Sequence, residues 1–234
     1  MTGELMDWEA VYREQGAFVG PPPWNIGEPQ PEITALIRDG KIRSDVLDAG
    51  CGVAELSLAL AAHGHTVVGI DVSASAIARA KQAAKDRGVE TAAFVQDDIA
   101  SFTGYDGRFN TIIDSTLFHS LPVEARDGYI RSVYRAAAPG ASYYVLVFAP
   151  AAFPFPDGAL PADSAPIPNH VTEQELREAV ARCWEVDDVR PAFIHAHLSD
   201  VLSRIPAVSL DDYEVDEKGR LKMPAFLLTA HKVG

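Results

Sequence analysis

The stretch VLDAGCGVAE, residues 46–55, joins a buried-looking run to a tight turn with two glycines and two acids. Dinucleotide-binding turns follow the pattern GxGxxG and hold an anionic pyrophosphate against backbone N–H groups. Here Gly50 and Gly52 would be the first pair, but Glu55 occupies the position of the third glycine. Asp48 and Glu55 would also repel a pyrophosphate. The turn therefore favours a cationic or zwitterionic nucleoside.

A further acid ends the next apolar run of the chain. Asp71 closes the segment TVVGID and follows the glycine turn by about 20 residues, a separation at which a carboxylate can accept hydrogen bonds from both hydroxyls of a ribose. The alternative role for Asp71 is an N-terminal helix cap, since a helical pattern begins at Ser73. Ribose binding is the favoured interpretation.

The elements that would position these residues alternate between strand-like and helix-like patterns. Such alternation is typical of a parallel sheet with crossover helices. The expected strands are residues 45–49, 66–71, 91–96, 109–114, 141–149, 184–198 and 223–233, the last at or near a sheet edge. The expected helices are residues 4–15, 33–40, 56–64, 73–88, 124–137 and 172–183. Ser73 is expected to cap its helix, and Thr172 with Glu175 to form a capping box.

Two proline-rich segments interrupt this alternation. GPPPWNIGEPQPEI, residues 20–33, contains five prolines, which favour an ordered loop over a flexible one. The second segment, residues 150–170, is too long for a routine connection, and long ordered loops of this kind often act as lids. A disordered insertion is the alternative for the second segment.

The composition predicts one globular domain that does not bind nucleic acid. A chain of 234 residues, 47% of them hydrophobic, can bury the core of a single α/β domain. The 33 acidic residues outnumber the 20 basic ones, and the net charge of -13 opposes binding to a phosphate backbone. Cys51 and Cys183 are too few for a disulfide framework. With no export signal or membrane-spanning run evident, a cytoplasmic protein is expected.

Four motifs in this order resemble those of the class I S-adenosylmethionine-dependent methyltransferases. VLDAGCGVAE resembles the first motif of that family, VVGIDVS the second, FVQDDI the third and FNTIIDSTLFHSL the fourth. RAAAPGASYYVLVF is similar to the family's turn into the fifth strand. The resemblance covers roughly residues 30–150. One departure is Ala54, where the family usually has a third glycine.

The resemblance implies a Rossmann-like, doubly wound α/β fold in one domain, residues 1–234. Its sheet would have seven strands, mostly parallel with an antiparallel final strand, and helices on both faces. Residues 1–32 would form a lid over cofactor and substrate, and residues 150–170 a substrate loop. The cofactor would be S-adenosyl-L-methionine, with S-adenosyl-L-homocysteine as the product.

The same resemblance implies the cofactor contacts. The glycine turn would let the backbone approach the methionine part of the cofactor, and Asp71 would bind the ribose. Asp98 would bind the adenine amino group, with Asp97 as the rival for that contact, while Ile99 would pack on the ring. The expected cofactor-binding residues are Trp24, Gln30, Asp48, Gly50, Cys51, Gly52, Asp71, Val72, Asp97, Asp98, Ile99, Asp114 and Ser115.

The end of the fourth strand is expected to carry the catalytic groups. Asp114 and Ser115 would lie beside the departing methyl group, where a carboxylate favours the sulfonium or the ammonium of the cofactor. His119 lies just beyond, where family members often place a residue that faces the acceptor. It is expected to act as a general base or to orient the acceptor. A histidine packed at a helix start is an equally weighted alternative.

The first proline-rich segment resembles the Trp-x-x-Gly-x-Pro-Gln-Pro segment of small-molecule methyltransferases. That group includes thiol and thiopurine enzymes and the bacterial heterocyclic toxin methyltransferases that act on hydroxyquinolones. In that group the segment folds over the cofactor. Trp24 would therefore cover the methionine end and contact the acceptor, and Gln30 would hydrogen-bond polar groups of the cofactor. A hydrophobic plug is the alternative role for Trp24.

Aromatic residues near the second proline-rich segment could form the acceptor pocket. Phe148, Phe153 and Phe155 would be walls that stack a flat ring, or else core residues under a loop. His195 and His197 alternate on an expected strand, but nothing supplies a third ligand, so no metal is expected.

The expected activity is methyl transfer to the hydroxyl of a small aromatic or heterocyclic compound that resembles a quinolone, with detoxification as its role. S-methylation of thiols or thiopurines is the alternative within the family. A non-catalytic nucleoside-binding protein is the alternative of another class. Enzymes that methylate base amines have Asn or Asp followed by two prolines and an aromatic residue, whereas residues 114–117 read DSTL. Nucleic-acid bases are therefore not expected as acceptors.

Overall fold

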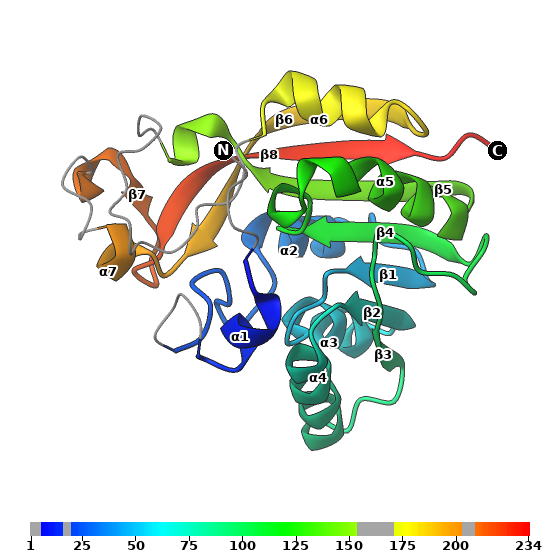
Figure 1. The fold of residues 1–234 in the computed structure, drawn as a ribbon, viewed down its shortest axis with the longest axis horizontal. Helices are drawn as coiled ribbons and strands as arrows, with labels where there is room; N and C mark the ends of the chain where they lie inside the picture. Colours follow the sequence, from blue (N-terminus) through cyan, green and yellow to red (C-terminus); the bar gives the residue numbers. More distant parts are fainter. Residues whose placement is uncertain (1–5, 16–19, 154–170, 203–208) are drawn as a thin grey trace.

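A mixed sheet forms the centre of the molecule in the computed structural model, which describes residues 6–15, 20–153, 171–202 and 209–234. The strand order is β3-β2-β1-β4-β5-β8-β6, and the short β7 pairs with β8 (Figure 1). The strands are β1 (Val46–Ala49), β2 (Val67–Asp71), β3 (Ala92–Gln96), β4 (Phe109–Ser115), β5 (Ala137–Phe148), β6 (Glu185–Ala196), β7 (Glu214–Val215) and β8 (Leu221–His231).

The strand directions confirm the expected Rossmann-like arrangement. The strands β3, β2, β1, β4 and β5 are parallel, whereas β8 is antiparallel to both β5 and β6. The last long strand lies between β5 and β6, so β6 and not β8 forms this edge of the sheet. The strand β7 was not expected, because two residues are too few to show an alternating pattern.

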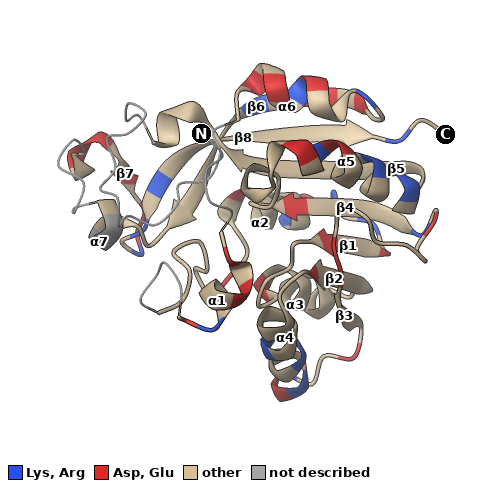
Figure 2. Ribbon diagram, viewed as in Figure 1, with Lys and Arg blue, Asp and Glu red and all other residues tan. Residues whose placement is uncertain are grey.

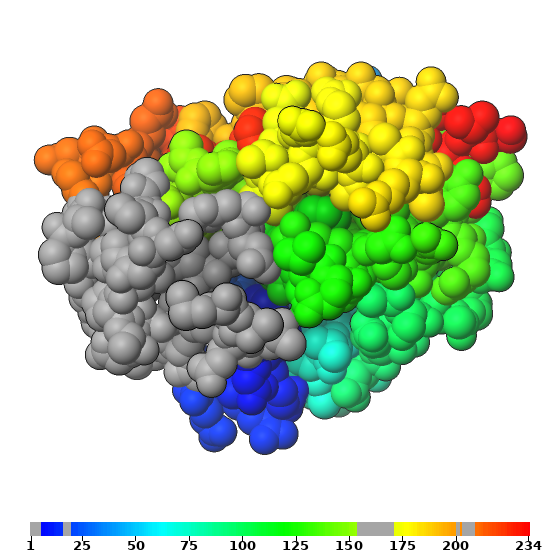
Figure 3. Space-filling model, turned by 45° about the horizontal axis from the view of Figure 1, so that its top comes forward, coloured from blue at the N-terminus to red at the C-terminus, as the bar shows by residue number. Residues whose placement is uncertain are grey.

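Helices cover both faces of the sheet, as expected. One face carries α2 (Pro31–Arg38), α3 (Glu55–Ala62) and α4 (Ala74–Asp86), and the other carries α5 (Arg126–Ala136) and α6 (Glu173–Val180). Figure 3 shows α6 in yellow packed beside α5 in green. Successive residues of a strand serve opposite faces, so Val46 belongs to the core under α2 and α3, and Leu47 to the core under α5.

Short elements complete the described chain. They are α1 (Trp8–Tyr12), α7 (Ser199–Leu202) and the 3-10 turns η1 (Phe118–Ser120), η2 (Val123–Ala125), η3 (Pro150–Ala152) and η4 (Leu210–Asp212). The first helix is shorter than the expected residues 4–15. Conversely, α2 begins two residues earlier than expected, because Pro31 at its first position already has the helical φ angle.

Both predicted helix caps are confirmed. The hydroxyl of Ser73 accepts a hydrogen bond from the N–H of Ala76 (3.1 Å) at the start of α4. At the start of α6, Thr172 accepts from the N–H of Glu175 (3.1 Å), and the carboxylate of Glu175 accepts from the N–H of Thr172 (2.8 Å). Each cap satisfies backbone donors that the helix itself leaves unpaired.

Charged residues of both signs are interspersed on the outer helices. Figure 2 shows basic and acidic segments next to each other on α4, α5 and α6. Within the described ranges, no helix combines the length and the apolar character needed to cross a bilayer.

Candidate functional site

A cavity of about 440 Å³ lies where β1, β2, β3 and β4 end. This edge of an open α/β sheet is where ligands bind. We call the residues that follow β1 and β2 the glycine-turn wall, and those that follow β4 the β4 wall; residues 6–15 and 20–30 are the N-terminal cover. The glycine-turn wall comprises Asp48, Gly50–Leu56 and Ile70–Val72, and the β4 wall comprises Ser115–Leu117, Ser120–Pro122 and Ala125.

Most residues predicted to bind the cofactor line this cavity. They are Trp24, Gln30, Asp48, Gly50, Cys51, Gly52, Asp71, Val72, Asp98, Ile99 and Ser115. The other two, Asp97 and Asp114, do not line it. The structure thus brings together residues from four strand ends and the N-terminal cover, while their individual contacts with a cofactor stay predictions.

The glycine turn has a backbone that other residues adopt only with strain. Gly50 and Gly52 have φ angles of +71° and +52°. A Cβ atom on Gly50 would lie 2.9 Å from Cδ1 of Leu117, and one on Gly52 would lie 2.6 Å from the hydroxyl of Tyr12. Ala54 also has a positive φ, 72°, so alanine takes the left-handed conformation that the family's usual glycine adopts more easily.

Two buried carboxylates flank the glycine turn. Asp71 accepts hydrogen bonds from the N–H groups of Gly52 (2.9 Å) and Ser73 (2.9 Å), and Asp48 accepts one from the hydroxyl of Ser57 (2.6 Å). Burial raises the pKa of Asp48 to about 6 and also raises the pKa of Asp71. Because desolvation penalises both charges, a cation in the cavity would stabilise them.

Glu55, the other acid of the turn, already has a cationic partner. Its carboxylate receives two N–H groups from Arg87, at 2.9 and 3.0 Å. The expectation that Glu55 repels a pyrophosphate is therefore weakened, because the partner cation offsets its charge. The acidic character of the turn depends on Asp48 and Asp71.

The residues after β3 separate the two rivals for the adenine contact. Asp98 and Ile99 line the cavity, whereas Asp97 does not. The carboxylate of Asp98 accepts from the N–H of Ala100 (2.9 Å), and that of Asp97 accepts from the N–H of Asp98 (2.8 Å). Position alone favours Asp98.

The N-terminal cover brings aromatic residues over the cavity that the sequence analysis did not single out. Met6, Trp8 and Tyr12 line it together with Trp24. The Trp8 and Trp24 rings pack edge to face, 5.8 Å apart, and the side chains of Tyr12 and Trp24 share a hydrogen bond. The available signal was the spacing of Trp8 and Tyr12, which places two aromatic residues on one face of the expected helix.

One carboxylate attaches α1 of the cover to the start of α4. Glu9 accepts from the hydroxyl of Ser73 (2.6 Å) and from the hydroxyl (2.7 Å) and N–H (3.1 Å) of Ser75. These hydrogen bonds, with that of Ser73 the largest cause, lower the pKa of Glu9 to about 2. Since Ser73 also contacts Asp71, the cover is joined to the residue predicted to bind ribose.

Gln30 attaches the other end of the cover to β6. Its amide oxygen accepts from the N–H of His195 (2.8 Å), and its amide nitrogen donates to the carbonyls of His195 (3.0 Å) and Trp24 (3.4 Å). This arrangement differs from the predicted hydrogen bond to the cofactor, because the amide is occupied by backbone groups. Gln30 lines the cavity, but its described polar contacts are structural.

Ion pairs strengthen the same attachment. Glu28, which lines the cavity, accepts from Arg220 (2.7 Å), and Arg220 in turn donates to Asp216 (2.6 Å). Asp216 also bonds Nδ1 of His195 (2.7 Å). Among the described residues, no group of three His, Cys, Asp or Glu side chains is placed to hold a metal ion.

His119 lies away from the cavity, contrary to the expectation that it faces the acceptor. It is 2% exposed, and its Nδ1 accepts a hydrogen bond from the N–H of Phe148 (3.2 Å). Burial, assisted by the charge of Arg126, lowers the pKa of His119 to about 3. A buried nitrogen that already accepts a hydrogen bond is poorly placed to take a proton. The structure thus agrees with the alternative, a histidine packed at a helix start.

The predicted aromatic walls are core residues in the structure. Phe148 and Phe153 are buried, pack edge to face with ring centroids 5.1 Å apart, and do not line the cavity. Both belong to the core on the α2 and α3 face of the sheet. Phe155 lies outside the described residues. The first two are therefore core residues, as in the alternative, whereas the loop of that alternative lies outside the described residues.

The donor set of the cavity fits the cofactor that the motifs imply. Carboxylates of Asp48, Asp71 and Asp98 line it, besides Glu28 and Glu55, which are paired with Arg220 and Arg87, and the described lining contains no Lys, Arg or His. A diphosphate would find no cation there, whereas the sulfonium and ammonium groups of S-adenosylmethionine would find acids. Gly50 and Gly52 also line the cavity, and the space that a Cβ would need on each is taken by a side chain of the protein, Leu117 and Tyr12 respectively.

Comparison with known proteins agrees with this geometry. Residues 46–140 match the family model described as a methyltransferase domain. A 2-heptyl-1-hydroxyquinolin-4(1H)-one methyltransferase from Mycobacteroides abscessus is 49% identical over 235 residues, which cover 99% of this chain and 100% of that protein.

Two solved structures share the fold of this chain. One that concerns conversion of a disulfide bond into a thioacetal group during echinomycin biosynthesis is 32% identical, has a TM-score of 0.78 and is matched over 100% of this chain and 93% of its own. A Burkholderia thailandensis 1,6-didemethyltoxoflavin-N1-methyltransferase with bound S-adenosylhomocysteine, 19% identical with a TM-score of 0.59, covers 87% of this chain and 77% of its own and shows the fold alone. The chain therefore belongs to the class I S-adenosylmethionine-dependent methyltransferases that act on small molecules.

Proposed function

We propose that this enzyme transfers a methyl group to a hydroxyl of a small aromatic or heterocyclic compound that resembles a quinolone. One observation carries the proposal: the 49% identity with the hydroxyquinolone methyltransferase extends over that protein's whole length. The aligned length includes the N-terminal cover and the β4 wall, which line the cavity and would contact an acceptor. Detoxification of such compounds is part of the same proposal.

The lining of the cavity supports a flat, apolar acceptor. Leu117, Leu121, Pro122 and Ala125 of the β4 wall are apolar, as are Met6 and Trp8 of the cover. Pockets for aromatic ligands combine such surfaces with a few polar groups that set orientation. Ser115, Thr116 and Ser120 are the hydroxyl-bearing residues of the β4 wall.

The glycine-turn wall would hold the cofactor. In this proposal Asp71 accepts the ribose hydroxyls, Asp98 the adenine amino group, and the backbone of Gly50 and Gly52 lies against the methionine part. S-adenosylmethionine supplies a methyl group on a positively charged sulfur. The chain then contributes binding, alignment and exclusion of water, which are the main effects available to a displacement of this kind.

The acceptor is proposed to be an acidic hydroxyl that needs no protein base. His119 is buried, its Nδ1 is occupied, and its pKa is about 3 because of burial. Asp114 does not line the cavity. A hydroxyl on an electron-poor ring ionises readily by itself, so alignment can suffice.

Labelled S-adenosylmethionine incubated with hydroxyquinolones, phenols and thiols tests this function. Label should appear in the hydroxyquinolones, and its rate should follow the ionisation of the acceptor hydroxyl as the pH is raised. Label in the phenols and thiols but in none of the hydroxyquinolones would refute the acceptor class without touching the family assignment.

A sulfur acceptor is the second candidate. It is favoured by the structure associated with thioacetal formation, at 32% identity over the whole of this chain. The same panel of acceptors decides between the oxygen and the sulfur candidate. If the natural acceptor is a thiol, the thiols should take up label faster than the hydroxyquinolones. Membership of the methyltransferase family sets aside a non-catalytic nucleoside-binding protein. Cytoplasmic location and the absence of nucleic-acid partners stay predictions.

A further inference from the structure

Asp114 is a fully buried acid whose two carboxylate oxygens are both engaged by the protein. One oxygen accepts from the N–H groups of Leu117 (2.8 Å) and Phe118 (3.2 Å). The other accepts from the hydroxyl of Tyr129 (2.8 Å). Asp114 is 0% exposed and does not line the cavity. The sequence suggested that Asp114 contacts the cofactor directly, but in the structure its carboxylate does not reach the cavity.

The turn that Asp114 bonds has an unfavourable backbone. Thr116, between Asp114 and the two N–H donors, has a φ angle of +80°. A β-branched residue in this region is a genuine outlier, and such a conformation persists only when surrounding contacts enforce it. The N–H of Thr116 donates to the carbonyl of Leu146 (3.0 Å), and its carbonyl accepts from the hydroxyl of Ser120 (3.1 Å).

This turn forms the contact between the β4 wall and the glycine-turn wall. Thr116 and Leu117 line the cavity. The side chain of Leu117 lies so close to Gly50 that a Cβ on the glycine would be 2.9 Å from its Cδ1 and 3.0 Å from its Cβ. A displacement of the Thr116–Leu117 backbone would therefore change the space beside the glycine turn, where the cofactor is expected.

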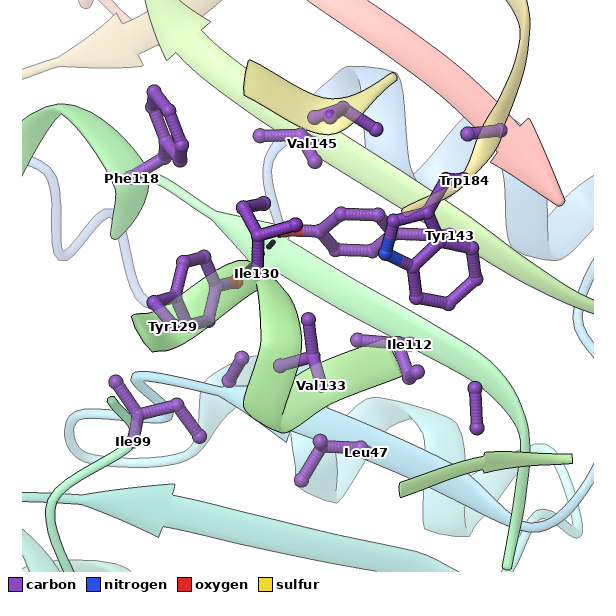
Figure 4. Packing of buried hydrophobic residues seen from close by; sticks show 14 of the residues in the cluster. Leu47, Ile99, Ile112, Phe118, Tyr129, Ile130, Val133, Tyr143, Val145 and Trp184 are labelled. Atoms are coloured by element: carbon purple, nitrogen blue, oxygen red, sulfur yellow. Dashed lines mark hydrogen bonds between the residues drawn. The ribbon is translucent and has the colours of Figure 1, made fainter. Parts of the chain in front are cut away.

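Two tyrosines orient the carboxylate, one by a direct hydrogen bond and the other through the first. The hydroxyl of Tyr143 on β5 donates to that of Tyr129 on α5 (3.0 Å), which donates to Asp114 (2.8 Å). Figure 4 shows these tyrosines meeting inside the apolar core, one on each side of Ile130 in this view. All three side chains are buried, so the chain of hydrogen bonds fixes the orientation of the carboxylate.

Asp114 is poorly suited to supply a fixed negative charge to the cofactor. Burial raises its pKa to about 7, against the opposing effect of hydrogen bonds from Tyr129, Leu117 and Phe118. Near neutral pH a population of neutral carboxyl groups is then present. The oxygen that accepts from Leu117 and Phe118 can do so in either protonation state.

We propose that Asp114 is a positioning residue, which holds the Thr116–Phe118 turn so that Leu117 lies on the bare backbone of Gly50 and shapes the cavity without touching cofactor or acceptor. Tyr129 and Tyr143 belong to the same device, because they orient the carboxylate. The proposal rests on the family's cofactor and not on the identity of the acceptor. It replaces the predicted electrostatic contact of Asp114 with the sulfonium.

The test compares binding of S-adenosylmethionine and S-adenosylhomocysteine, measured by calorimetry, in Asp114→Asn and Asp114→Ala. The two ligands differ by the positive charge at sulfur. Asp114→Ala should weaken both by the same factor, about tenfold, as hydrogen bonds to an ionisable acceptor are lost. Asp114→Asn keeps an acceptor oxygen for the turn and should stay within about threefold of the wild type.

A glycine rescue separates positioning from other structural effects. Thr116→Gly removes the backbone strain, so the double variant Asp114→Ala/Thr116→Gly should recover much of the lost affinity for both ligands. Should Asp114→Ala not fold, Tyr129→Phe provides the measurement, with an equal loss for both ligands of about threefold. Asp86→Asn on the surface of α4 is the matched control and should change neither affinity.

Two results would overturn the proposal. A loss confined to S-adenosylmethionine and equal in Asp114→Asn and Asp114→Ala would mean that the carboxylate acts through its charge. Failure of Thr116→Gly to restore any affinity would mean that the turn is not what Asp114 holds.

Discussion

The glycine-turn wall and the β4 wall of the cavity are built differently. The first is set by backbone conformation, with positive φ angles at Gly50 and Gly52 and two buried carboxylates beside them. The second is made of side chains such as Leu117 and Leu121, and its backbone is held by an acid outside the cavity. A wall of backbone suits a ligand that never changes, whereas side chains can be exchanged to suit different acceptors without disturbing the fold.

The largest effect is expected from Gly50→Ala. The added methyl group would meet Leu117 at 2.9 Å and would strain a residue with φ of +71°. We expect S-adenosylhomocysteine affinity to fall by about 2–3 kcal/mol, the cost of a strained backbone plus a clash. Calorimetry measures it. Gly88→Ala, with φ of +64° and open space, is the control and should affect stability but not affinity.

Asp71→Asn should have the next largest effect, and it tests the polar part of the glycine-turn wall. Loss of the charged acceptor predicted for the ribose hydroxyls should weaken S-adenosylhomocysteine by about 1–3 kcal/mol. Thermal unfolding run alongside would reveal whether the bonds to Gly52 and Ser73 survive. Unaltered affinity in a folded variant would remove Asp71 from the ribose site.

The pH dependence of the free energy of unfolding tests Asp114, the acid behind the β4 wall. Burial raises the pKa of Asp114 from 3.8 to about 7 in the folded protein, so the folded state binds this proton more tightly than the unfolded state. The stability that this proton contributes is fully present below the pKa of Asp114 in the unfolded state. It is lost as the pH rises through the pKa of Asp114 in the folded state.

Unfolding free energies of the wild type and Asp114→Asn, measured in urea at about pH 5.5 and about pH 8, should therefore differ in their pH dependence by about 1–2 kcal/mol. The wild type should lose more stability on going to the higher pH. Carboxylates with lowered pKa values, such as Glu9, titrate below this window. Parallel pH profiles would contradict the expected burial cost of Asp114.

The smallest effect is expected from His119→Gln. Because the pKa of His119 is about 3 and its Nδ1 already accepts from Phe148, it should contribute no ionisation to catalysis near neutral pH. Turnover should change by less than about threefold, with an unshifted pH profile, as for a packing residue. Loss of the acid limb of the profile would restore His119 as the base.

The glycine-turn wall could be predicted because its determinants are consecutive. The run of strand, Gly50, Gly52 and helix is local, and so is the carboxylate at the end of the next strand. Local caps such as that of Ser73 were predicted for the same reason. Parallel strand order then brings these strand ends together without further information.

The β4 wall and the cover could not be predicted to the same degree. The motif that contains His119 correctly places this residue just beyond β4. However, η1 turns the imidazole towards Phe148, a direction that no local pattern encodes. Gln30 was assigned to the cofactor, whereas its partner His195 lies 165 residues further along the chain. The position of β8 between β5 and β6 is likewise a long-range outcome.

The attachment of the cover to β6 has a consequence for biosynthesis. Glu28 and Gln30 leave the ribosome long before His195 and Arg220, so they can dock only after those later residues have emerged. We expect nascent chains stalled before β6 to bind no cofactor even though the whole glycine turn has been translated. Cofactor capture by such stalled chains would show that the early residues can close the pocket unaided.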